Sequence, residues 1–292
     1  MTTQKWDAAR ILVGILIGAG SRCVAGPEAP PTESASLHSK LIPWVEVNTL
    51  DPVAIDRAVE GLLIWRQITD TAIVSTTPGR AELYRRLKQK VPDFQIVPGL
   101  KTHSVLDRFD SVEGWRTIAG DVSAFVEITG SWQVVLENET ALKSYAHGNQ
   151  EMSLEHLRDG LALLPKNVRV VWYPSIYGQD AKTQQRLEAV CRIVAQQCDV
   201  QFTDLSIDGP KRIGDRWQGM AREKLKPLSR HPTMPILYCY GDDRWWQDEQ
   251  IPEAIRMAEG KTVILYPGSK RWPEAARSLS GLLQSQVTRG SP

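Results

Sequence analysis

Short runs of apolar, β-branched and aromatic residues recur along the chain from residue 41 onward. Eight of these runs predict strands, and they begin near Leu41, Thr71, Phe94, Gln133, Val168, Val200, Pro235 and Thr262. The segments between the runs carry apolar residues at helical spacing, which in the first segment are Ile55, Ala58, Val59, Leu62 and Leu63. The pattern therefore predicts strands that alternate with helices.

Four of the predicted helices are preceded by residues that favour a helix N-terminus. Asp51 and Thr77 each stand directly before a proline, a residue favoured in the first turn of a helix. Asp110 has a glutamate three residues further on, and Asp180 precedes the helical stretch AKTQQ. We expect helices to begin at these places.

Strict alternation of apolar strands and helices is typical of parallel strands joined by crossover helices. Eight such units over residues 41–292 match the size of a (β/α)8 TIM barrel, which has about 250 residues. The alternative is an open, doubly wound sheet, which favours a glycine-rich phosphate turn after its first strand. The segment WVEVNTLDP has no such turn, so the sequence predicts an α/β fold of the barrel type in a single domain.

The first 26 residues have the charged, apolar and small-residue layout of a secretory signal peptide. Lys5 and Arg10 precede the apolar run 11–20, which is too short to span a bilayer as a helix. Residues 27–40 are rich in Pro, Ser and Glu and predict a linker. We therefore expect a secreted or periplasmic protein, with an N-terminal anchor as the alternative.

Composition disfavours nucleic acid as a partner and favours a binding surface that contains tryptophan. With 35 Lys and Arg against 34 Asp and Glu, the net charge of +1 provides no field that would hold a nucleic acid. Tryptophan is unusually common, at 10 residues against 4 phenylalanines, which suggests that some indoles form a binding surface. Cys191, Cys198 and Cys239 are expected to be buried free thiols.

In a (β/α)8 barrel, the chemistry is found at the C-terminal ends of the strands. The acidic residues at or near these ends include Glu46, Glu137, Glu139, Asp204 and Asp242. Other polar and aromatic residues there are Asn138, Trp172, Tyr173, Tyr238, Tyr240, Trp245, Trp246 and Tyr266. Sugars offer apolar ring faces to flat indoles and hydroxyls to polar groups, so this set favours carbohydrate as the substrate or ligand.

Paired carboxylates are the groups that glycoside hydrolysis requires. Strand alternation places Glu137 and Glu139 on one face, so one of them is the candidate acid that protonates the glycosidic oxygen. Asp204 or Asp242 is the candidate nucleophile, base or charge stabiliser. The structural alternative is that Glu137 forms an ion pair with a neighbouring basic residue, either Lys101 or Arg169.

The dipeptide Asn138-Glu139 after the fourth predicted strand resembles the Asn-Glu pair of the retaining barrel glycosidases. That resemblance implies a substrate-binding role for Asn138 and an acid/base role for Glu139. The same clan has its nucleophilic glutamate after the seventh strand. Here the segment PILYCYGDDRWW departs from the pattern, because it offers Asp242 and Asp243 instead.

The missing glutamate keeps a second class of function open, a carbohydrate-binding or scaffold barrel without turnover. Lys101, after the third predicted strand, also permits a Schiff-base lyase. The five histidines are scattered, with no His-x-His after the first strand, so no metal centre is predicted. No cofactor is predicted either, and the sequence favours a glycoside hydrolase-like barrel.

Overall fold

The computed structural model describes residues 41–102, 111–137, 153–173, 181–207, 233–239, 251, 262–266 and 273–289. The predicted signal segment and linker lie outside these residues. So do six candidate site residues, namely Asn138, Glu139, Tyr240, Asp242, Trp245 and Trp246.

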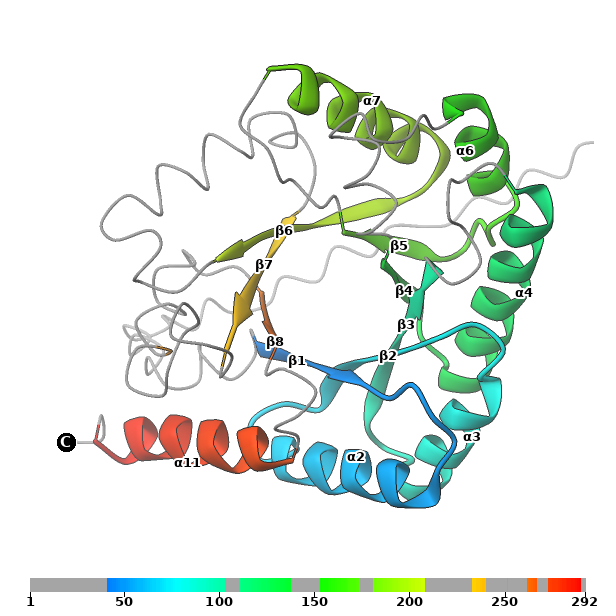
Figure 1. Ribbon diagram of the computed structural model, residues 1–292. Coiled ribbons are helices and arrows are strands. Elements are labelled where there is room, and N and C mark those ends of the chain that lie inside the picture. The colour runs from blue at the N-terminus through cyan, green and yellow to red at the C-terminus, as the bar shows by residue number, and fades with distance from the viewer. Residues whose placement is uncertain are drawn as a thin grey trace, which may run out of the picture. The chain divides into compact units, whose positions relative to one another are not determined.

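Eight parallel strands form a closed barrel in sequence order, and the last strand pairs with the first (Figure 1). They are β1 (Leu41–Glu46), β2 (Thr71–Thr76), β3 (Gln95–Lys101), β4 (Gln133–Glu137), β5 (Arg169–Trp172), β6 (Val200–Ile207), β7 (Thr233–Tyr238) and β8 (Val263–Tyr266). Each strand begins within two residues of the position that its apolar run predicts. The predicted (β/α)8 fold is therefore confirmed.

Helices lie around the outside of the strands in Figure 1. Those within the described residues are α2 (Pro52–Trp65), α3 (Ala81–Lys90), α4 (Val112–Thr129), α6 (Leu154–Leu161), α7 (Ala181–Gln197) and α11 (Glu274–Arg289). In the part of the chain that the structure covers, no helix has both the length and the apolar character needed to cross a membrane.

Two of the expected helix starts have a side-chain cap near the predicted place. The carboxylate of Asp51 accepts a hydrogen bond from the Val53 amide at 3.1 Å, and Pro52 is the first residue of α2. At α4 the cap is Ser111, whose hydroxyl accepts from the Gly114 amide at 2.9 Å, while Asp110 lies outside the described residues. Both caps satisfy an amide that the first turn leaves without a helical partner.

Helix α3 begins later than the sequence predicts. It starts at Ala81 and not directly after Thr77, because a turn at Pro78 and Gly79 comes first. Gly79 has φ 77°, a left-handed conformation that glycine adopts readily. The carboxylate of Asp121 on α4 accepts a hydrogen bond from the Gly79 amide at 2.9 Å and holds the turn against the neighbouring helix.

Seven of the strands, all except β6, contribute apolar side chains to both faces of the barrel wall, which explains why their sequences are apolar runs. One cluster lies between the strands and the helices and includes the large side chains of Trp65, Trp115 and Phe125. A smaller cluster fills the inside of the barrel and includes Trp44 and Val135. Trp44, Trp65 and Trp115 are all buried, so these three indoles belong to the core.

Candidate functional site

Side chains from five strands meet inside the barrel at the C-terminal ends of the strands. They are Glu46 of β1, Ser75 of β2, Lys101 of β3, Glu137 of β4 and Tyr266 of β8. Glu46, Ser75 and Glu137 each follow a residue of the inner apolar cluster by two positions, and strand alternation therefore turns them inward. We call these five residues the mouth cluster.

Glu46 is engaged on both of its carboxylate oxygens. The ammonium nitrogen of Lys101 lies 2.6 Å from Oε2, and the hydroxyl of Tyr266 donates to Oε1 at 2.7 Å. The side chains of Glu46 and Lys101 are only 14% and 12% exposed, so water screens this ion pair less than a surface pair. Glu46 therefore links three strands and orients its two partners.

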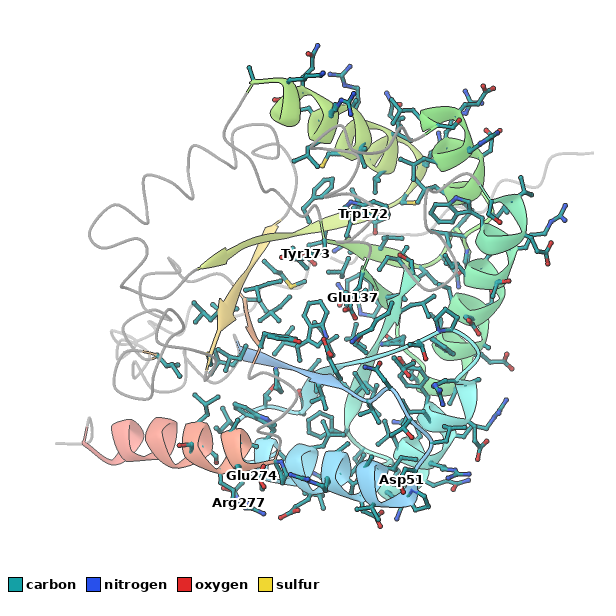
Figure 2. The ribbon with its side chains drawn as sticks, in the orientation of Figure 1. Asp51, Glu137, Trp172, Tyr173, Glu274 and Arg277 are labelled. Atoms are coloured by element: carbon teal, nitrogen blue, oxygen red, sulfur yellow. The ribbon has the colours of Figure 1, made fainter. Side chains whose placement is uncertain are left out.

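Glu137 points into the barrel and is held at its side chain and its main chain (Figure 2). The hydroxyl of Ser75 donates a hydrogen bond to Glu137 Oε1. The main-chain carbonyl of Glu137 accepts from the hydroxyl of Thr102 at 2.9 Å. Of the two basic residues expected beside Glu137, Lys101 forms an ion pair with Glu46, and Arg169 forms one with Asp199 at 2.9 Å.

Gly99 on β3 leaves the space that Ser75 occupies. A Cβ atom at position 99 would lie 2.9 Å from the Cβ and 3.0 Å from the Cα of Ser75, closer than packed atoms approach. Behind this contact, the hydroxyl of Tyr84 on α3 lies 2.8 Å from the carbonyl oxygen of Val74 and 3.1 Å from that of Gly99. Burial raises the pKa of Tyr84 well above its usual value, so the phenol stays neutral and remains a donor.

Trp172 and Tyr173 are neighbours in sequence but face opposite sides of the barrel wall (Figure 2). Tyr173 is 6% exposed and belongs to the inner cluster, near the level of the mouth cluster. Trp172 is fully buried in the outer cluster, between strands and helices. The expectation that Trp172 binds substrate at the rim is wrong for that reason, since no face of its indole is open.

For two further candidates, Asp204 and Tyr238, the structure describes the backbone but not the side chain. Asp204 is on β6, and its backbone is in register with Pro235 of β7. A register shift follows between Asp204 and Ser206. Tyr238 is the last residue of β7 and is in register with Tyr266.

Sequence reasoning missed Ser75, the partner of Glu137. A serine inside the apolar run TAIVST carries no charge and drew no attention. Its inward position was available from alternation, because Ser75 follows the inner residue Ile73 by two positions. Its pairing with β4, two strands away, depends on barrel closure and could not be obtained from spacing along one strand.

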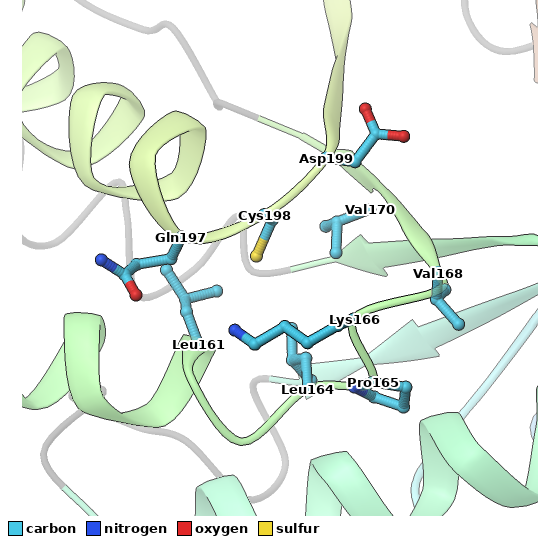
Figure 3. Close-up of a pocket in the computed structure, with 9 residues that line it drawn as sticks. All are labelled: Leu161, Leu164, Pro165, Lys166, Val168, Val170, Gln197, Cys198 and Asp199. Atoms are coloured by element: carbon cyan, nitrogen blue, oxygen red, sulfur yellow. The ribbon is translucent and has the colours of Figure 1, made fainter. Parts of the chain in front are cut away.

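A small cavity lies at the other end of β5, between the end of α6 and the end of α7 (Figure 3). Its lining includes Lys166, Val168, Cys198 and Asp199. At about 20 Å³ it holds no more than one water molecule, so it is not a substrate site.

The three cysteines within the described residues are free, as the sequence predicts. Burial raises the pKa of the Cys198 thiol to about 11 and that of Cys191 to about 12. Among the described residues, no group of three or more His, Cys, Asp or Glu side chains is placed to hold a metal ion.

Comparison with known proteins identifies the fold. No protein-family model matches the chain, and no curated protein sequence matches it. A mutant O-GlcNAc hydrolase from Thermobaculum terrenum is 13% identical with a TM-score of 0.50, over 85% of this chain and 60% of that chain. A family 18 chitinase from Crocus vernus is 9% identical, with a TM-score of 0.48 over 86% of this chain and 100% of that chain.

The structural neighbours also include a putative deoxyribose-phosphate aldolase from Toxoplasma gondii. It is 13% identical with a TM-score of 0.49, over 86% of this chain and 96% of that chain. The present chain spans about 60% of the length of the O-GlcNAc hydrolase. A glycoside hydrolase is thus among the structural neighbours, and what this chain shares with it is the barrel fold.

Proposed function

We propose that this barrel acts on a carbohydrate by carboxylate chemistry at its mouth, as a glycoside hydrolase. The observation that supports the proposal is the placement of Glu137. It lies inside the barrel at the C-terminal end of β4, and a buried serine holds its carboxylate. A carboxylate in that position stands where barrel enzymes carry out their chemistry.

In the proposed reaction, a carboxylic acid gives its proton to the glycosidic oxygen while the bond from that oxygen to the anomeric carbon breaks. Glu137 or Glu139 is the candidate acid. Asp204 or Asp242 would then attack the anomeric carbon, activate water, or stabilise the oxocarbenium-like transition state. A carboxyl separation of about 5–5.5 Å would give retention, and about 6.5–9.5 Å would give inversion.

The proposed substrate contacts come from residues around the same mouth. Tyr173 and Tyr266 present phenol groups on the inside of the barrel, and Tyr266 already donates to Glu46. Asn138, Tyr238, Tyr240, Trp245 and Trp246 remain proposed contacts from the sequence. Trp172 is no longer among them, because it is buried in the outer cluster. We also propose export of the chain to a secreted or periplasmic location.

A polysaccharide screen with product analysis tests this function. The full chain and its Glu137→Gln and Glu139→Gln variants would be incubated with a panel of glycans, and released sugars would be identified with their anomeric form. We expect release by the parent chain and loss in at least one variant. Hydrolysis that persists in both variants would disprove the assignment of the acid.

A carbohydrate-binding or scaffold barrel without turnover is the second candidate. The contacts of Glu46 with Lys101 and Tyr266 favour this second candidate. They give the Glu46 carboxylate a structural role, because they connect three strands. A glycan array combined with product analysis separates the two functions. A binding protein retains a glycan on the array and releases no product from it.

The Schiff-base alternative gains no support from the ion pair of Lys101. Attack on a carbonyl carbon requires an amine that is free to reach it, whereas the Lys101 nitrogen lies 2.6 Å from the Glu46 carboxylate in a mostly buried contact. Reduction with borohydride in the presence of a carbonyl substrate would trap a Schiff base as a stable adduct, and we expect no adduct at Lys101.

A further inference from the structure

We infer that Ser75 is a positioning residue, which presets Glu137 as a charged carboxylate at the barrel mouth before any substrate binds. The inference deepens the proposed function and rests on it for the catalytic meaning of Glu137. The contact itself stands on the structure alone.

The donor is fixed in place by burial. Ser75 is completely buried on β2, and its hydroxyl donates to Oε1 of Glu137 on β4. The contact passes over the intervening strand β3, which pairs with both β2 and β4. A buried hydroxyl with a defined acceptor has no water to exchange with, so its hydrogen bond imposes an orientation on the carboxylate.

The strand between them is shaped to allow this contact. Gly99 is the residue of β3 in register with Ser75, and any side chain there would begin 2.9 Å from the Ser75 Cβ. The absence of a Cβ atom therefore lets Ser75 sit against the backbone of β3. Tyr84 supports the same place from behind through the carbonyl oxygens of Val74 and Gly99.

The main chain of Glu137 is held as well as its side chain. The Thr102 hydroxyl donates to the Glu137 carbonyl oxygen at 2.9 Å, just beyond the end of β3. Two hydroxyl donors thus fix the position of the residue and the direction of its carboxylate. A preset group of this kind does not need to reorganise when the reaction begins.

The chemistry follows from the direction of the hydrogen bond. A hydroxyl that donates to a carboxylate stabilises the charged form relative to the acid. The hydrogen bond thus narrows the proposed roles. Glu137 takes the role of nucleophile, base or charge stabiliser, and Glu139, the other candidate acid, gives the proton to the glycosidic oxygen. As nucleophile, Glu137 would form a bond to the anomeric carbon as the leaving oxygen takes that proton and departs as an alcohol.

The test is a carboxyl titration that requires no substrate. The full chain would be labelled with ¹³C at the glutamate side-chain carboxyl, and the Glu137 signal would be identified by its loss in Glu137→Gln. Removal of a hydrogen bond to a charged group should raise the titration midpoint of Glu137 in Ser75→Ala by about 1 pH unit. Gly99→Ala should move the midpoint in the same direction, because the new methyl displaces Ser75 while the hydroxyl remains.

Thr76→Val is the matched control. Thr76 is the next residue on the same strand and is equally buried, but its hydroxyl donates to the Val47 carbonyl oxygen at 2.7 Å on the other side of the wall. The Thr76→Val substitution should therefore leave the titration midpoint of Glu137 unchanged. A midpoint that stays constant or falls in both Ser75→Ala and Gly99→Ala would overturn the inference.

The titration and the hydrolysis assay can fail separately. A rise of the midpoint in a chain that releases no sugar would support the positioning role of Ser75 and disprove the hydrolase function. If the parent chain releases sugar but the Glu137 midpoint does not move in the two variants, the hydrolase function is supported and the positioning role of Ser75 is disproved. With an identified glycan, Ser75→Ala should also shift the acidic limb of the kcat/KM profile to higher pH.

Discussion

Lys101 of β3 holds Glu46 of β1 across the inside of the barrel, with 2.6 Å between the ammonium nitrogen and Oε2. The pair passes over β2, as the contact between Ser75 and Glu137 passes over β3. The two links overlap along the barrel wall and connect four consecutive strands. The mouth is therefore cross-linked by polar contacts above an apolar interior.

Breaking the link at Glu46 should destabilise the fold. Glu46→Gln removes one charge of a mostly buried ion pair, so we expect the free energy of unfolding to fall by about 2–3 kcal/mol. Urea denaturation measures this change. Glu274→Gln is the control, because its partner Arg57 and Glu274 itself are 53% and 56% exposed, and its effect should be about 0–1 kcal/mol.

Two glycines in outer helices should respond in opposite ways to alanine. In α6, a Cβ atom on Gly160 would lie 2.2 Å from the ring of Trp115, so Gly160→Ala should destabilise the protein by about 1–3 kcal/mol or more. In α4, Gly120 is exposed and has open space around it. Gly120→Ala should stabilise the protein by about 0.5–1 kcal/mol, and equal effects in denaturation experiments would contradict the packing described.

Asp121 should give the stability a pH dependence of defined sign. Partial burial raises the pKa of this carboxyl above its usual value near 3.8, although the Gly79 amide opposes the shift. The charged form is therefore disfavoured in the fold, and the stability that the acid form contributes below pH 3.8 is lost as the pH rises through the folded pKa.

Replacement by asparagine removes this titration and keeps an oxygen that can accept from Gly79. Asp121→Asn should thus be more stable than the parent chain at pH 7, and the difference should shrink as the pH approaches 4. Urea denaturation across this range measures it, with Asp93→Asn, at an exposed carboxylate, as the control for loss of one charge. A difference that grows toward low pH would contradict the assigned direction.

Cys191 of α7 and Cys198, directly after that helix, should react slowly. Burial raises the pKa of Cys198 from about 9 to about 11, which lowers its thiolate fraction at pH 8 by roughly 100-fold. Cys191 should react more slowly still, because its pKa is about 12 and it is buried. Alkylation by iodoacetamide, followed residue by residue with mass spectrometry, tests this order. In urea, both thiols should react at the same fast rate, and a fast reaction of Cys198 in the native chain would contradict the prediction.

The sequence predicts the fold well because most of the strands bury apolar side chains on both faces. Parallel strands inside a ring of helices leave few polar positions, so runs such as QVVLEN and VRVVWYPS mark the strands directly. The helix starts were less well predicted. At α3, the proline after Thr77 belongs to a turn that Gly79 completes, and the helix begins only at Ala81.

The site is harder to predict, because its contacts connect strands that are not neighbours. Alternation identified Glu137 as an inward candidate, but the partners of Glu46 and Glu137 depend on how the closed barrel aligns β1 with β3 and β2 with β4. For Trp172, the sequence contained the information needed, but the prediction used the wrong part of it. Position at a strand end suggested the rim, whereas alternation from Val171 of the inner cluster turns the indole outward.

The rate of sugar release by Glu137→Gln tests the central claim most directly. On a glycan that the parent chain hydrolyses, we predict a loss of at least about 100-fold in kcat, because the variant keeps the shape of the side chain and loses its charge and proton transfer. Glu127→Gln, at an exposed glutamate of α4, should keep the parent rate. Release by Glu137→Gln within about twofold of the parent rate would contradict the assignment of this carboxylate to the chemistry.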